Sequence, residues 1–220
     1  MTLLTWDTTV LDTAVVNGSG LWGVGLRSNW TADDSTTNNV FLAGDSAQFN
    51  VGTLYGVSTV SGVVDLSGLT IETVETVDVS HSFTGGTLNF TSGAAFTNSS
   101  QNVTVAIDSD ISGAGNLALD VSNATFGGNM SLAGTLLMNN TSTFVNNGTI
   151  GNNVFKSSGS MVNNGAINGN VEVNYATFDN FGAINGAVTL DGTTFNNFGT
   201  VSGPVNMSPW ASFNEFGFVT

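Results

Sequence analysis

The 220-residue sequence contains no cysteine, one histidine, two prolines and two basic residues. Without cysteine, disulfides, thiolate metal sites and cysteine nucleophiles are all excluded. The two basic residues stand against 16 acidic ones, which leaves a formal net charge of -14. This charge repels phosphate backbones and anionic lipid surfaces, so nucleic-acid binding is excluded. No run approaches the roughly 18 apolar residues that span a bilayer, so we expect no membrane insertion by this segment.

Charged residues of both signs are also scarce, at 8% of the chain, whereas glycine occurs 28 times. Asparagine, threonine and serine are abundant. This composition disfavours helix and favours strands punctuated by turns. Because 40% of the residues are hydrophobic, the chain can bury one sizeable core. The composition predicts a single all-β domain over residues 1–220.

A seven-residue pattern recurs in the C-terminal half. It reads F-V-N-N-G-T-I from Phe144, M-V-N-N-G-A-I from Met161, F-D-N-F-G-A-I from Phe178, F-N-N-F-G-T-V from Phe195 and F-N-E-F-G-F-V from Phe213. These openings are 17, 17, 17 and 18 residues apart, and we place a sixth copy 18 residues earlier, at Phe126. A period this short cannot hold a helix pair. It predicts one coil of a parallel β-helix (β-solenoid).

The residue types within one coil can be placed by counting from its opening residue as position 0. Position 0 is large and apolar and position 6 is β-branched, while positions 10 and 12 alternate inward, as in Val171 with Val173 and Val188 with Leu190. This pattern predicts three short strands per coil. Position 4 is always glycine and position 8 usually is, so we expect corners where the backbone turns through positive φ. Stacked coils at about 4.8 Å spacing then superpose like residues.

Positions 2 and 3 carry the candidate interaction residues. Position 2 predicts a hydrogen-bonded structural ladder of Asn146, Asn163, Asn180 and Asn197, followed by Glu215. Position 3 changes from asparagine to phenylalanine along the array, giving a stripe of Phe181, Phe198 and Phe216. We expect this stripe to stack inside a corner. If the corner instead turns the rings outward, the stripe is a candidate docking surface for another chain.

The array divides the chain. Residues 1–50 hold three of the four tryptophans and predict an N-terminal cap with the first strands, residues 51–125 predict irregular coils, and residues 126–220 the regular coils. The last copy stops at Thr220, seven residues into its period. We interpret the sequence as part of a longer chain with an unpaired coil edge.

Several motifs resemble a known family. The motifs are S-N-W-T around Trp30, G-D-S-A-Q-F from Gly44, G-G-T-L-N-F from Gly85 and I-S-G-A-G-N-L-A-L from Ile111. Together they resemble autotransporter passenger domains and their associated β-strand repeats. The resemblance implies a right-handed parallel β-helix displayed outside a bacterial cell. A 17-residue coil is short for that helix and also fits a smaller left-handed one.

The sequence contains few groups of residues that could act together in catalysis. His81 is the only histidine and has no cysteine or second histidine beside it, so we expect a surface or turn residue. The strong bases Arg27 and Lys156 have no carboxylate cluster near them in sequence. The array acids fall at different positions of the coil, so none stacks on another; they are Glu172, Asp179, Asp191 and Glu215. We therefore expect no enzyme activity and no cofactor.

Calcium is the remaining ligand to weigh. Asp108 and Asp110, together with Asp120 or with Asp33 and Asp34, carry the oxygen ligands that calcium prefers. Their spacing matches neither an EF-hand loop nor the calcium-binding nonapeptide. We interpret them as solvated turn acids and predict no metal site.

The sequence thus favours a structural or adhesive segment of a secreted bacterial cell-surface protein, such as an outer-membrane adhesin of biofilms. A rigid stalk or binding surface would act without catalysis, with a receptor on a host, a surface or a glycan as its partner. A filament or matrix protein that self-associates through open coil edges is the first alternative. A carbohydrate-active β-helix enzyme is the second.

Overall fold

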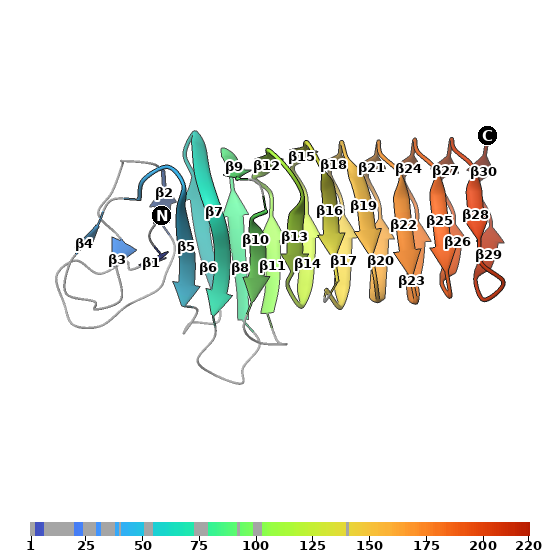
Figure 1. Cartoon of the computed structure of the whole chain (residues 1–220), viewed down its shortest axis with the longest axis horizontal. Coiled ribbons are helices and arrows are strands. Elements are labelled where there is room, and N and C mark those ends of the chain that lie inside the picture. Colours follow the sequence, from blue (N-terminus) through green and yellow to red (C-terminus); the bar gives the residue numbers. More distant parts are fainter. Residues whose placement is uncertain are drawn as a thin grey trace.

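The computed structural model describes residues 3–6, 20–23, 30–31, 38–39, 41–50, 55–72, 79–91, 93–98, 103–139 and 141–220. Within these ranges the chain forms strands and turns and no helix. The strands stack in parallel as a β-solenoid of about 8 turns. Figure 1 shows the coils following one another along the long axis. The predicted all-β parallel solenoid is confirmed.

Each regular coil contributes one strand to each of three faces. The first face is a ten-stranded sheet of β2 (Gly20–Trp22), β6 (Tyr55–Val60), β8 (Val79–Thr84), β11 (Val103–Ile107), β14 (Asn123–Phe126), β17 (Thr143–Asn146), β20 (Gly159–Asn163), β23 (Ala176–Asn180), β26 (Thr194–Asn197) and β29 (Ser212–Glu215). The second face holds β9 (Thr87–Phe90), β12 (Asp110–Gly113), β15 (Asn129–Leu132), β18 (Thr149–Ile150), β21 (Ala166–Ile167), β24 (Ala183–Ile184), β27 (Thr200–Val201) and β30 (Phe218–Val219). The third face holds β10 (Ala95–Asn98), β13 (Leu117–Asp120), β16 (Thr135–Met138), β19 (Asn153–Lys156), β22 (Val171–Asn174), β25 (Val188–Asp191) and β28 (Val205–Met207).

The second and third faces join at the N-terminal end of the stack. There the long strand β7 (Val63–Glu72) pairs with both β9 and β10, and β5 (Asp45–Asn50) pairs with β7. Strand β1 (Leu3–Trp6) adds to β5 in parallel, while β3 (Trp30–Thr31) and β4 (Asn38–Asn39) continue this edge antiparallel. Trp22 and Trp30 are buried here and their ring centroids lie 5.4 Å apart. Trp22 and Trp30 therefore extend the core of the stack.

The core is a set of inward columns that run along the stack. Position 0 pairs Phe144 with Met161, Met161 with Phe178, Phe178 with Phe195 and Phe195 with Phe213 in successive strands of the first face. The first four of these side chains are fully buried. Rings in this column stack directly, with 4.7 Å between the centroids of Phe178 and Phe195. Each fully buried large apolar side chain contributes roughly 1.5–3 kcal/mol to folding.

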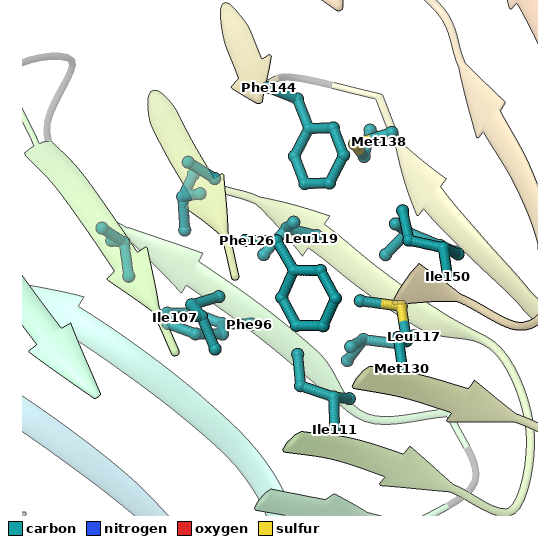
Figure 2. Packing of buried hydrophobic residues seen from close by; sticks show 14 of the residues in the cluster. Phe96, Ile107, Ile111, Leu117, Leu119, Phe126, Met130, Met138, Phe144 and Ile150 are labelled. Carbon is teal, nitrogen blue, oxygen red and sulfur yellow. The ribbon is translucent and has the colours of Figure 1, made fainter. Parts of the chain in front are cut away.

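The phase assigned to Phe126 from its spacing is wrong. Strand pairing puts Ala124 opposite Phe144, whereas Phe126 lies opposite Asn146, at position 2. Both phenylalanine rings nonetheless lie in the buried core (Figure 2). The difference arises because the coils are longer upstream. Asp65 and Asn89, hydrogen-bonded across neighbouring coils, are 24 residues apart, whereas the ladder asparagines Asn146 and Asn163 are 17 apart.

Glycine at position 4 has a different cause from the one expected. None of these residues, for example Gly165 and Gly182, is among the glycines with positive φ. A Cβ atom on Gly182 would instead collide with the carbonyl oxygen of Gly165 in the preceding coil. The coils approach each other so closely at this corner that only glycine fits. Position 8 follows the same rule, because a Cβ atom on Gly186 would strike the backbone of Gly169.

Candidate functional site

The position-2 asparagines form a continuous column of hydrogen bonds inside the core. The Nδ2 amide of Asn146 donates to Oδ1 of Asn163, that of Asn163 to Asn180, and that of Asn180 to Asn197, each at 2.7 Å. The amide of Asn197 then donates to Oε1 of Glu215 at 2.9 Å. All four asparagines are fully buried. Each amide oxygen and nitrogen thus finds a partner where water is excluded, which makes burial of these polar groups tolerable.

The phenylalanine stripe points outward, so the expectation that it stacks inside a corner is wrong. Phe181, Phe198 and Phe216 are 53%, 46% and 67% exposed. In each coil the strand ends at position 2, and position 3 lies in the bend that follows. The alternation of the strand continues into this bend, so the residue after the inward position 2 points outward. The rings lie almost parallel, with centroids 4.8 Å apart for Phe181 and Phe198 and 5.0 Å for Phe198 and Phe216. Neighbouring rings cover each other's faces along this stripe.

His81 is neither a surface nor a turn residue, contrary to expectation. It lies within β8 and is buried, with its ring 4.8 Å from the rings of both Phe49 and Phe83. Gly56 of the preceding coil makes room for the ring, because a Cβ atom there would lie 2.6 Å from Nδ1. Burial lowers the pKa of His81 to about 4, so the imidazole is neutral at pH 7.

Ser58 completes a buried pair with this histidine. Its Oγ and the Nε2 atom of His81 share a hydrogen bond of 3.0 Å, and Ser58 itself is fully buried. A serine beside a histidine is the geometry of an activated nucleophile. Here aromatic side chains enclose the pair, so a substrate has no direct access to the hydroxyl group. The geometry fits a satisfied polar contact in the core.

Lys156 is the second ionisable group in the interior. It lies in β19, at position 12 of its coil. The paired residue is Met138 in the preceding coil and Val173 in the following coil. Its side chain is fully buried, and Nζ donates to the carbonyl oxygen of Thr141 at 2.6 Å. Desolvation lowers the pKa of Lys156 to about 8. This lysine therefore stays mostly protonated at pH 7 in surroundings that disfavour its charge.

The described acids form no ligand cluster. Among the described residues, no group of three or more histidine, cysteine, aspartate or glutamate side chains is placed to hold a metal ion. Oδ1 of Asp110 accepts hydrogen bonds from the backbone and side-chain nitrogens of Asn129, and Oδ1 of Asp120 accepts one from the backbone of Asn139. Arg27, Asp33 and Asp34 lie outside the described ranges.

A depression that the sequence did not suggest lies on the third face. It has a volume of about 280 Å³, and its lining includes Asn153, Phe155, Asn170, Glu172 and Thr189. These residues come from β19, β22 and β25 and from the turns that precede them. These residues fall at positions 9 and 11 of their coils. Because the residue types at these positions vary from coil to coil, the repeat pattern did not indicate a site here. Only strand pairing brings them together.

None of the described residues forms a helix that could span a membrane. The comparisons with protein-family models, curated proteins and solved structures found no match to the chain.

Proposed function

We propose that this chain is a structural or adhesive segment of a secreted bacterial cell-surface protein, in which the β-solenoid serves as a rigid stalk and carries a binding surface without catalysis. The observation that carries the proposal is the unbroken parallel pairing of the first face, which runs from β2 to β29 in one sheet. Each internal strand bonds to the coil before and the coil after it, so bending or shearing the rod must break many hydrogen bonds together.

Two further observations support this proposal over catalysis. The Ser58–His81 pair is enclosed in the core. Asp179 pairs along the stack with Asn196, and Asp191 with Asn174, so these two acids do not face a second carboxylate in the neighbouring coil. The solenoid fold also agrees with the β-helix of autotransporter passenger domains, which the motifs resemble, and we propose display outside the cell on that basis.

Surface display is tested on intact cells of the bacterium that makes the protein. Antibodies raised against the purified chain should label intact cells, and protease added outside the cells should remove the label. Recovery of the chain only from the soluble interior of lysed, protease-treated cells would overturn the proposed location.

The stalk role is tested by pulling single molecules between the two ends of the chain. We expect stepwise unfolding, in which each 17-residue coil releases roughly 55–60 Å of extended chain. High resistance with such steps supports a mechanical role. Gradual extension at low force, without steps, would contradict it.

A further inference from the structure

The depression on the third face combines two kinds of fixed polar group with one aromatic side chain. Asn153 and Asn170 occupy the same column in successive coils, since their neighbours Val154 and Val171 pair directly. The next outward column contains one residue from each of three successive coils, namely Phe155, Glu172 and Thr189. Neighbouring members of a column are about 4.8 Å apart. The depression therefore presents two parallel rows of side chains that run along the stack.

The asparagine row supplies hydrogen-bond donors of fixed orientation. Oδ1 of Asn153 accepts the backbone N–H of Asn170, and Oδ1 of Asn170 accepts the backbone N–H of Ala187, each at 2.9 Å. These bonds hold the amide planes in place. The structure gives neither Nδ2 group a hydrogen-bond partner within the described ranges. Two pre-oriented amide donors thus remain available to a ligand.

The second row supplies acceptors and an apolar surface. Glu172 is exposed, and only its Oε1 atom is engaged, by the Nδ2 amide of Asn174 at 3.3 Å. Thr189 adds a hydroxyl group in the next coil, while Phe155 is half-buried on the other side of Glu172. A carboxylate beside amide donors matches a hydroxyl group that must donate one hydrogen bond and accept another.

We propose that this depression binds a neutral oligosaccharide. Sugar hydroxyl groups both donate and accept, which the two rows require, and the C–H face of a sugar ring can pack on Phe155. Charge selects against acidic glycans, because the one lysine or arginine of the described residues, Lys156, is buried. The inference goes beyond the stalk proposal. Its test uses the purified chain, so it can fail independently of where the protein is located.

The test titrates the purified 220-residue chain with neutral hexasaccharides, namely cellohexaose, maltohexaose, laminarihexaose and mannohexaose. At least one should shift the side-chain amide NMR signals of Asn153 and Asn170, with a dissociation constant of about 1 mM. Absence of any shift at about 10 mM with all four sugars would overturn the proposal. Equal or tighter binding of hexagalacturonate would overturn the neutral specificity.

Two variants locate the site, and the array itself suggests both. Glu172→Thr places in β22 the residue that β25 has at the same position, so the coil should tolerate it. Asp179→Asn removes the same charge from the first face and places there the residue of the next coil. Glu172→Thr should weaken binding by about tenfold or more, since a charge-assisted hydrogen bond is lost. Asp179→Asn should leave binding within about twofold; equal effects of the two variants would refute the site.

Discussion

Asn180 lies in the middle of the buried asparagine column and bonds to both neighbours. Its amide donates to Asn197, and its Oδ1 atom accepts from Asn163. Asn180→Ala leaves one donor and one acceptor unpaired in the core, so the free energy of unfolding should fall by about 2–4 kcal/mol. Denaturant unfolding measures the loss. Asn185→Ala is the control, because Asn185 makes its bond to Asn168 on the exposed surface, where water replaces it.

Replacing Lys156, in contrast to Asn180, should raise the stability of the chain. The pKa of Lys156 is about 8 in the folded chain, against 10.5 for a lysine in water, so between these limits the unfolded chain binds more protons. Stability should therefore rise with pH from about 8 to 10.5, with a slope of up to about 1.4 kcal/mol per pH unit. Lys156→Met copies Met138 of the preceding coil, removes the slope and should stabilise the chain at pH 7 by roughly 1–2 kcal/mol. A less stable variant would mean that the bond to Thr141 outweighs the cost of burying the charge.

His81 makes stability depend on pH at the acidic end. The folded chain keeps this imidazole neutral down to a pKa of about 4, whereas the unfolded chain protonates near 6.5. The unfolded state binds more protons between these limits, so stability should fall as the pH drops from about 6.5 to 4. Thermal unfolding at several pH values tests this. The double variant Ser58→Ala/His81→Phe, which removes both polar partners, should show a smaller loss over that interval.

Residue-scale prediction from the sequence worked where the repeat carried information. The apolar letters at position 0 identified an inward column because they recur in five copies at intervals of 17 or 18 residues. His81 could not be placed in this way, since its burial depends on the absence of a side chain at Gly56, in a coil outside the regular array. Nothing local in S-H-S-F indicates that missing side chain.

At the scale of the strand, the two phenylalanines of β26 and the following corner can be compared directly. Phe195 is fully buried, whereas Phe198, three residues later, is 46% exposed. Phe195→Ser should cost about 3–5 kcal/mol of stability. Phe198→Ser loses only its contacts with the two neighbouring rings of the stripe, so it should cost roughly 1–2 kcal/mol. Calorimetry on both variants decides this, and equal losses would contradict the outward orientation.

The direction of this stripe was within reach of the sequence. Strict alternation from an inward position 0 makes position 2 inward and position 3 outward. The segment F-N-N-F-G-T-V from Phe195 therefore predicts an outward side chain for Phe198. The expectation was wrong because it put position 3 inside the corner, whereas β26 ends at Asn197 and Phe198 lies in the bend that follows with its side chain exposed.

For the whole molecule, coil length is the quantity that the fold must preserve. Deleting residues 161–177 removes one period and joins Ser160 to Phe178, which keeps every column in register. The shortened chain should fold cooperatively and be about 4.8 Å shorter, and deleting residues 161–194 should shorten it by roughly 10 Å. Small-angle scattering measures the length. Deleting only residues 161–169 shifts the columns out of phase and should prevent folding of the array; equally good folding would contradict a register-defined core.

The architecture could be predicted for the regular half, because one period repeated in the sequence implies one coil repeated in space. It could not be extended to the upstream coils. Ser112 and Asn89, hydrogen-bonded between neighbouring coils, are 23 residues apart, whereas Asn129 and Asp110 are 19 apart. A changing coil length leaves no constant spacing to detect, so the 18-residue spacing assigned Phe126 to the wrong column.

The asparagine column has a direction, which gives it a fixed start and a fixed stop. Every amide donates toward the C-terminal side, and an asparagine can continue the series because it both accepts and donates. Glu215 accepts from Asn197 and from the backbone of Gly217, but a carboxylate has no proton to pass on. At the other end, Oδ1 of Asn146 accepts the backbone N–H of Gly148. The residue that pairs with Asn146 in the preceding coil is Phe126, whose side chain cannot donate a hydrogen bond. The series is therefore terminated by side-chain chemistry at both ends, and its length does not depend on how many coils the rod contains.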